Sequence, residues 1–249
     1  MIVMQYANSG NLLSYLDQNV NTLTWKMKLG YLKCIADYLS SIHRAGLVHR
    51  DIHGGNIVMH DDTRGIQCFI CDLGLSQSMN SREQNSNIQA VLPFIAPEIF
   101  HACKFTQKSD VYSFGIIMYL MATGKPPFRD RQFDRELVCD IMGGLRPLMP
   151  DSAPKEYKKL AEWCCDADPD KRPDAERIWN NIFKLIIKMD YGNCDNVWST
   201  IYHSNVKPLS RLEKESKYSS KLLPTGDLPK PRNSYDLDSA AGMTIIVMY

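Results

Sequence analysis

The segment from His49 to Asn56 constrains the fold of this chain most, because it separates a long amphipathic stretch from the short apolar run 57–59. It reads His-Arg-Asp-Ile-His-Gly-Gly-Asn, which places a carboxylate, Asp51, five residues before the carboxamide of Asn56. A carboxylate can accept a hydrogen bond from a substrate hydroxyl, and a carboxamide oxygen can bind a hard cation such as magnesium. The alternative interpretation is an ordinary turn between a helix and a strand.

Helical patterns lie on both sides of this segment. Apolar residues recur near the helical period from Thr24 onward and Gly46 ends the pattern, so this helix should anchor the loop that carries Asp51. A second pattern begins at Ser109 and is apolar on nearly all sides, which predicts a central buried helix. Further helices are expected at 12–16, 133–143, 154–165 and 174–189.

Two strand-like runs, 57–59 and 67–71, follow the loop, and the residues between them have the composition of a hairpin turn. Asp72-Leu73-Gly74 stands immediately after the second run. The next segment, 76–89, is polar and is expected to form a mobile exposed loop before the sequence Pro-Phe-Ile-Ala-Pro-Glu at 93–98.

Composition excludes several classes of protein. A formal net charge of +1 favours neither a nucleic-acid surface nor a polyanionic substrate. Eight cysteines without a secretory signal indicate reduced thiols rather than a disulfide framework, and the CxxC pair of Cys68 and Cys71 has no second pair to complete a zinc site. The longest apolar run, 115–122, is too short to span a membrane. We expect a cytoplasmic protein, and a nuclear location stays open.

The composition changes after Asn193 to Ser, Lys, Pro and Asn. We therefore expect two parts: a folded domain over residues 1–193 and a low-complexity, mostly disordered tail over residues 194–249.

Four signals stand in one order along the chain: His49-Arg50-Asp51 with Asn56, Asp72-Leu73-Gly74, Ala96-Pro97-Glu98, and the buried helix near Asp110. In this order they resemble the large C-terminal lobe of a eukaryotic protein kinase, over about residues 2–189. The resemblance implies a mainly α-helical lobe with a small β-hairpin at the active site. It also implies that Arg172 pairs with Glu98 and that Asp110 braces the catalytic loop.

The resemblance assigns roles to single residues. Asp51 would orient the substrate hydroxyl and accept its proton, and Asn56 and Asp72 would hold the Mg2+ ions that bridge the phosphates of ATP. Arg50 matches the arginine that docks a phosphorylated activation loop. The candidate phosphate acceptors in that loop are Ser76, Ser78, Ser81 and Ser86.

The same resemblance indicates where adenine would bind. Gln5 and Ala7 match the positions whose backbone groups hydrogen-bond adenine, Met4 falls at the gatekeeper position, and Val58 would pack under the ring. Each apolar residue of this set could equally be an ordinary core residue.

Two departures concern the acceptor amino acid. His53 stands where serine/threonine kinases usually place a lysine, and Val91 replaces the threonine that marks those kinases. We expect phosphoryl transfer from ATP to Ser or Thr of a protein substrate, in a tyrosine-kinase-like branch, and tyrosine is not excluded. The expected partners are a protein substrate or a partner kinase, without nucleic acid or membrane.

The 249 residues begin at what would be the last strand of the small lobe. They contain no glycine-rich loop, no strand lysine for the α- and β-phosphates and no helix glutamate to pair with that lysine. Because phosphoryl transfer depends on charge neutralisation and positioning, we expect a truncated form that binds ATP too weakly for useful turnover. The alternative is a non-catalytic, pseudokinase-like module that binds partner proteins.

Overall fold

The long helix α2 (Trp25–Arg44) begins where the Thr24 hydroxyl accepts a hydrogen bond from the Met27 N–H. It is followed by Gly46, whose φ of 72° is the left-handed conformation that suits glycine after a helix. The structure is a computed structural model that describes residues 7–63, 65–78, 89–191, 218, 221–222 and 228–234. The apolar residues Leu29, Leu32, Ile35, Ala36 and Leu39 of α2 are fully buried in it. The predicted helix is confirmed.

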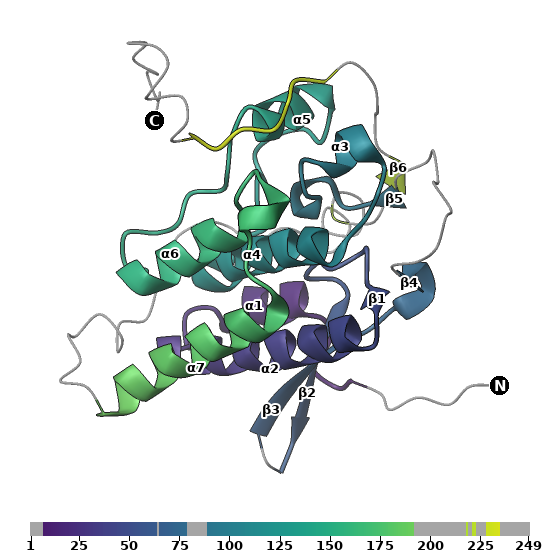
Figure 1. Ribbon diagram of the computed structural model, residues 1–249. Coiled ribbons are helices and arrows are strands. Elements are labelled where there is room, and N and C mark those ends of the chain that lie inside the picture. The colour runs from purple at the N-terminus through teal and green to yellow at the C-terminus, as the bar shows by residue number, and fades with distance from the viewer. Residues whose placement is uncertain are drawn as a thin grey trace.

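Helix α4 (Gln107–Thr123) lies at the centre of the molecule (Figure 1). Thr106 and Ser109 cap its first turn reciprocally, with each side chain accepting from the other residue's backbone N–H. Nearly every residue along the helix is buried, as its unbroken apolar pattern predicts.

The remaining helices surround these two. They are α1 (Leu12–Asn19), α3 (Ile99–Ala102), α5 (Arg135–Met142), α6 (Lys155–Cys164) and α7 (Ala175–Tyr191), with single 3-10 turns at Leu73–Leu75, Leu92–Phe94 and Pro169–Lys171. Helix α7 packs along α2 and α6 packs along α4, so a second layer covers the two long helices (Figure 1). The helices expected at 133–143, 154–165 and 174–189 are confirmed to within about two residues of each end.

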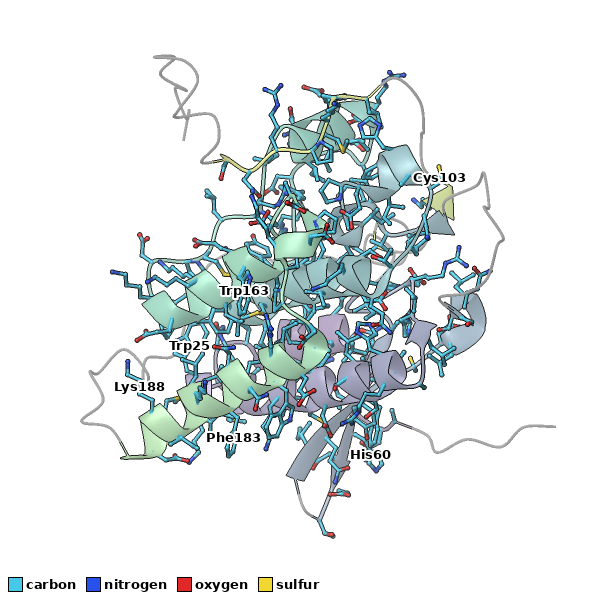
Figure 2. The ribbon with its side chains drawn as sticks, in the orientation of Figure 1. Trp25, His60, Cys103, Trp163, Phe183 and Lys188 are labelled. Atoms are coloured by element: carbon cyan, nitrogen blue, oxygen red, sulfur yellow. The ribbon has the colours of Figure 1, made fainter. Side chains whose placement is uncertain are left out.

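A short hairpin extends from this helical body (Figure 1). Strands β2 (Ile57–Asp62) and β3 (Gly65–Ile70) pair antiparallel, with Ile57 opposite Ile70. Ile57 and Met59 point into the core, whereas His60, labelled in Figure 2, belongs to the other, half-buried face. The predicted fold, mainly α with a small hairpin, is confirmed.

Two further strand pairs are short. Strand β1 (Leu47–Val48) pairs with β4 (Gln77–Ser78), and β5 (Gln89–Ala90) pairs with β6 (Lys221–Leu222). Strand β6 belongs to the segment expected to be disordered. Within that segment the described residues, Tyr218, 221–222 and 228–234, pack on the lobe, so the structure differs from the expectation at these positions.

Several expectations fall outside the described residues: Met4 and Gln5, Ser81 and Ser86, and most of the segment 194–249. Among the helices of the described residues, none has the length and apolar character needed to cross a membrane.

Candidate active site

The carboxylate of Asp110 holds the start of the loop 49–56. It is almost completely buried in the first turn of α4. Its two oxygens accept hydrogen bonds from the backbone N–H groups of His49 (2.8 Å) and Arg50 (2.9 Å). Arg50 has a φ of 76°, an unfavourable backbone conformation, and the carboxylate offsets part of its cost by bonding the Arg50 N–H and the N–H of the residue before it. The brace that the resemblance implies is present.

The His49 ring links this loop to the end of β3. The Asp51 N–H donates to His49 Nδ1 at 3.3 Å, and His49 Nε2 lies 3.2 Å from the Cys71 carbonyl oxygen. The tautomer that satisfies both contacts is neutral, with its proton on Nε2. Burial lowers the pKa of His49, which favours that neutral form. The ring therefore couples the position of Asp51 to the residue that precedes Asp72.

Asp51 itself is buried and is oriented by Asn56. The Asn56 side-chain nitrogen donates to the Asp51 carbonyl oxygen at 2.9 Å and to Asp51 Oδ2 at 3.0 Å. His53 Nε2 approaches the same Oδ2 at 3.5 Å, while His53 Nδ1 accepts the Gly55 N–H. The predicted general base and its carboxamide thus form one hydrogen-bonded unit.

Asn56 and Asp72 provide oxygen ligands that suit magnesium. Because the Asn56 nitrogen donates to Asp51 twice, its neutral Oδ1 is the atom it can present to a cation. Asp72 adds a carboxylate that is exposed and that accepts the Gly74 N–H at 3.2 Å. Among the described residues, no group of three or more His, Cys, Asp or Glu side chains could hold a metal ion by itself. A two-ligand oxygen set fits Mg2+ that is completed by phosphates and water.

A small cavity lies beside Asp51. Its wall includes Arg50, Asp51 and residues of the segment 90–96, among them Ala90 and Phe94. The Ser113 hydroxyl, on α4, donates to the Phe94 carbonyl oxygen at 2.6 Å and so fixes this wall to the central helix. The free space in this cavity is about that of one water molecule, so it is a narrow gap between the loop and this wall.

Arg50 points along the start of the segment that follows Asp72. Its guanidinium donates to the Leu75 carbonyl oxygen at 3.3 Å and lies over the Phe105 ring, 4.8 Å from its centre. The side chain therefore spans both ends of the segment 75–105. Of the candidate phosphate acceptors within the described residues, Ser76 is half-buried and Ser78 is exposed.

The residues expected near adenine are described only in part. Ala7 is half-buried ahead of the turn that packs on the hairpin, where the Ser9 N–H donates to the Met59 carbonyl oxygen. Val58 lies on the hairpin face opposite the core and pairs with Phe69. Both positions suit an apolar surface beside a ring, and their adenine contacts remain predictions.

The pair of Glu98 and Arg172 joins the segment 89–105 to the lobe. Both guanidinium NH groups donate to the two carboxylate oxygens at 2.7 Å, and the arginine is buried. The same guanidinium lies 5.1 Å from the centre of the Tyr112 ring. The contact that the resemblance implies is therefore a buried bidentate ion pair.

The loop, the brace and this ion pair agree with the comparison with known families. A family model described as protein tyrosine and serine/threonine kinase matches residues 1–182. The chain belongs to this family.

Known relatives give the same result. The chain is 31% identical over 189 residues to a probable serine/threonine-protein kinase of Dictyostelium discoideum, a match over 74% of this chain and 14% of that protein. It is 30% identical over 192 residues to the probable serine/threonine-protein kinase roco9 of the same organism, over 75% of this chain and 6% of that kinase. The chain thus corresponds to a small part of the curated relatives it matches.

Some contacts of this kinase site have no local signal in the sequence. His43 Nε2 lies 3.0 Å from the Asp110 carboxylate, and Phe105 lies under Arg50. Both contacts join residues more than fifty positions apart, and neither residue belongs to a motif. Only the folded lobe brings them to the site.

Proposed function

We propose that this chain is the catalytic-loop lobe of an ATP-dependent protein kinase that transfers a phosphoryl group to Ser or Thr of a protein. The observation that carries the proposal is the hydrogen-bonded unit formed by Asp51 and Asn56 on the loop that Asp110 braces. The names of the relatives favour Ser and Thr over Tyr as acceptors.

The geometry supports a specific division of work. The Asp51 carboxylate, fixed by Asn56, would accept a hydrogen bond from the acceptor hydroxyl and would take its proton during transfer. Asn56 Oδ1 and the Asp72 carboxylate would hold the Mg2+ that accompanies ATP, and this ion supplies charge neutralisation on the phosphates. Asp110 and His49 position the loop without touching substrate.

Binding of nucleotide tests this assignment directly. In a titration of the isotope-labelled chain with ATP and MgCl2, we expect weak, Mg2+-dependent shifts of the amide signals of Asn56 and Asp72. Asp72→Asn should weaken the effect, whereas Asp130→Asn, at a carboxylate with 91% of its side chain exposed, should not. Absence of Mg2+-dependent shifts at both residues at millimolar nucleotide would overturn the proposal and favour the non-catalytic interaction module.

We expect slow turnover from these 249 residues by themselves, since they include no glycine-rich loop and no strand lysine for the phosphates. A phosphorylation assay with the purified chain and Asp51→Asn measures this. Rapid phosphoryl transfer by the chain, abolished in Asp51→Asn, would show that these residues by themselves are sufficient for catalysis.

A further inference from the structure

We call residues Tyr218, 221–222 and 228–234 the C-terminal strap. The strap crosses parts of the lobe that are far from it in the sequence. In Figure 1 the yellow segment passes over α5, and β6 lies beside β5. The strap contacts the turn after α4, the segment 89–105, the end of α5 and the loop after α6. Its contacts are therefore spread over four separate parts of the lobe.

Tyr218 anchors the first part of the strap. Its side chain is buried, with the hydroxyl donating to the Pro127 carbonyl oxygen at 3.1 Å. Its ring packs edge-to-face on Phe133, with the ring centres 5.2 Å apart. A buried aromatic ring whose hydroxyl is hydrogen-bonded indicates a specific binding site on the lobe rather than a chance contact.

The other end of the strap satisfies backbone groups of the lobe. The Arg232 N–H donates to the carbonyl oxygen of Met142, the last residue of α5, at 2.8 Å. The buried Asn233 side chain accepts the Ala167 N–H at 2.7 Å and donates to Asp166 Oδ1 at 3.1 Å.

Gly144 contributes to the binding site for this end of the strap. Its φ is +106°, and a Cβ atom there would lie 2.8 Å from the backbone of Asn233. Only glycine combines this conformation with so close an approach of a second backbone. The lobe thus provides a fitted surface for an extended segment at this point.

Strand β6, which is part of the strap, lies next to the candidate active site. Lys221 pairs with Ala90, and Ala90 is a wall residue of the cavity that contains Asp51. A strand that pairs with β5 occupies one of its two edges and so restricts the movement of this part of the cavity wall.

We propose that this face is a binding site for an extended peptide segment, that the C-terminal strap is its intramolecular occupant, and that docking of the strap fixes the cavity wall beside Asp51. The docking of the strap does not rest on the proposed kinase function. The partner that fits is an extended segment with an aromatic hydroxyl residue, a short strand, and an asparagine fifteen residues after the aromatic.

Hydrogen exchange of the full chain tests the proposal. In Tyr218→Ala we expect amides of residues 89–91 and 232 to exchange about tenfold faster or more, while those in the middle of α4 are unchanged, because the strap opens as a local unit. Tyr218→Phe keeps the ring and should have a smaller effect. Lys230→Ala, at an exposed strap residue, is the matched control. Equal exchange in the chain and in Tyr218→Ala, or faster exchange throughout α4, would overturn the proposal.

A second arm tests the site itself. A synthetic peptide with the sequence of residues 216–234, added to Tyr218→Ala, should restore slow exchange at residues 89–91. No restoration at millimolar peptide would contradict a peptide-binding face. Neither arm measures nucleotide or phosphoryl transfer, so failure here is distinct from failure of the kinase assignment.

Discussion

The two aspartates of the site are held in different ways. Asp51 is buried, bonded to Asn56, and carried on a loop whose backbone donates twice to the buried carboxylate of Asp110. Asp72 is exposed and is followed by Leu73, whose side chain is 52% exposed. The proposed base is thus held by the core of this lobe, whereas the proposed metal ligand, which we call the metal side of the site, is held by few contacts of the lobe.

The difference follows from what each segment packs against. The loop 49–56 packs against α1 and α4, and the close packing of Gly54 on Leu13 and Leu120 leaves no room for a Cβ. Residues 72–74 lie beyond the end of β3 and bury no side chain completely. The exposed carboxylate of Asp72 can therefore move to meet an incoming ion, whereas the buried carboxylate of Asp51 stays in place.

The largest effect should come from the brace. Asp110→Ala leaves the N–H groups of His49 and Arg50 buried without their acceptor, at a cost of about 4 kcal/mol in the free energy of unfolding. Urea denaturation measures this. Asp130→Asn, at an exposed carboxylate, is the control and should change stability by less than about 0.5 kcal/mol. A loss below about 1 kcal/mol in Asp110→Ala would mean that the loop does not need its brace.

A smaller effect is expected inside the loop. A Cβ on Gly55 would lie 2.7 Å from His53 Cε1, and this ring is buried and bonded through Nδ1, so Gly55→Ala should cost about 2 kcal/mol. Gly30→Ala is the matched control, since nothing lies within 4 Å of its Cβ position in α2 and alanine should stabilise the helix by about 0.5–1 kcal/mol. Equal effects of the two substitutions would contradict the tight packing of the loop.

Acid should weaken the loop through His49. The folded pKa of His49 lies below its ordinary value of 6.5, so the unfolded chain binds the proton more tightly and stability is lost as the pH falls below about 6.5. Protonated Nδ1 also can no longer accept the Asp51 N–H. From pH 7 to pH 5 the free energy of unfolding should fall more steeply in the unsubstituted chain than in His49→Gln. A constant difference would exclude this role of the ring.

The smallest effect on stability should come from the exposed aspartate. Asp72→Asn should change the free energy of unfolding by less than about 0.5 kcal/mol, because the carboxylate is exposed and its contact is the neighbouring Gly74 N–H. The same substitution should reduce Mg2+-dependent ATP binding about tenfold or more, since it removes a charged ligand. A large loss of stability would show that the metal side is also part of the core.

The sequence predicts the parts of this lobe that leave a local pattern. The helix around Leu32 follows from the helical spacing of its apolar residues, and the helix around Phe114 from a pattern that is apolar on nearly all sides. The spacing of Asp51 and Asn56 indicates a base next to a metal ligand. The pair of Glu98 and Arg172 could be expected only through the family resemblance, because 74 residues separate the two partners. Contacts at that separation are made by the fold and have no periodic signature.

The contacts of the strap with the lobe are a feature that amino-acid composition does not predict. A segment rich in Ser, Lys and Pro predicts disorder, because too few apolar side chains are available to offset the entropy of ordering. Average composition does not detect that Tyr218 and Asn233 each meet a fitted site on the lobe. Single anchors of this kind require the structure.

The most direct measurement compares amide hydrogen exchange in the two halves of the site, without and with Mg2+ and ATP. The account predicts slow exchange at residues 49–51 and 56 already in the free chain, and fast exchange at residues 72–76 that slows when Mg2+ and ATP are added. Fast exchange at both segments in the free chain, or no change at residues 72–76 with nucleotide, would contradict a preformed base beside a ligand-dependent metal side.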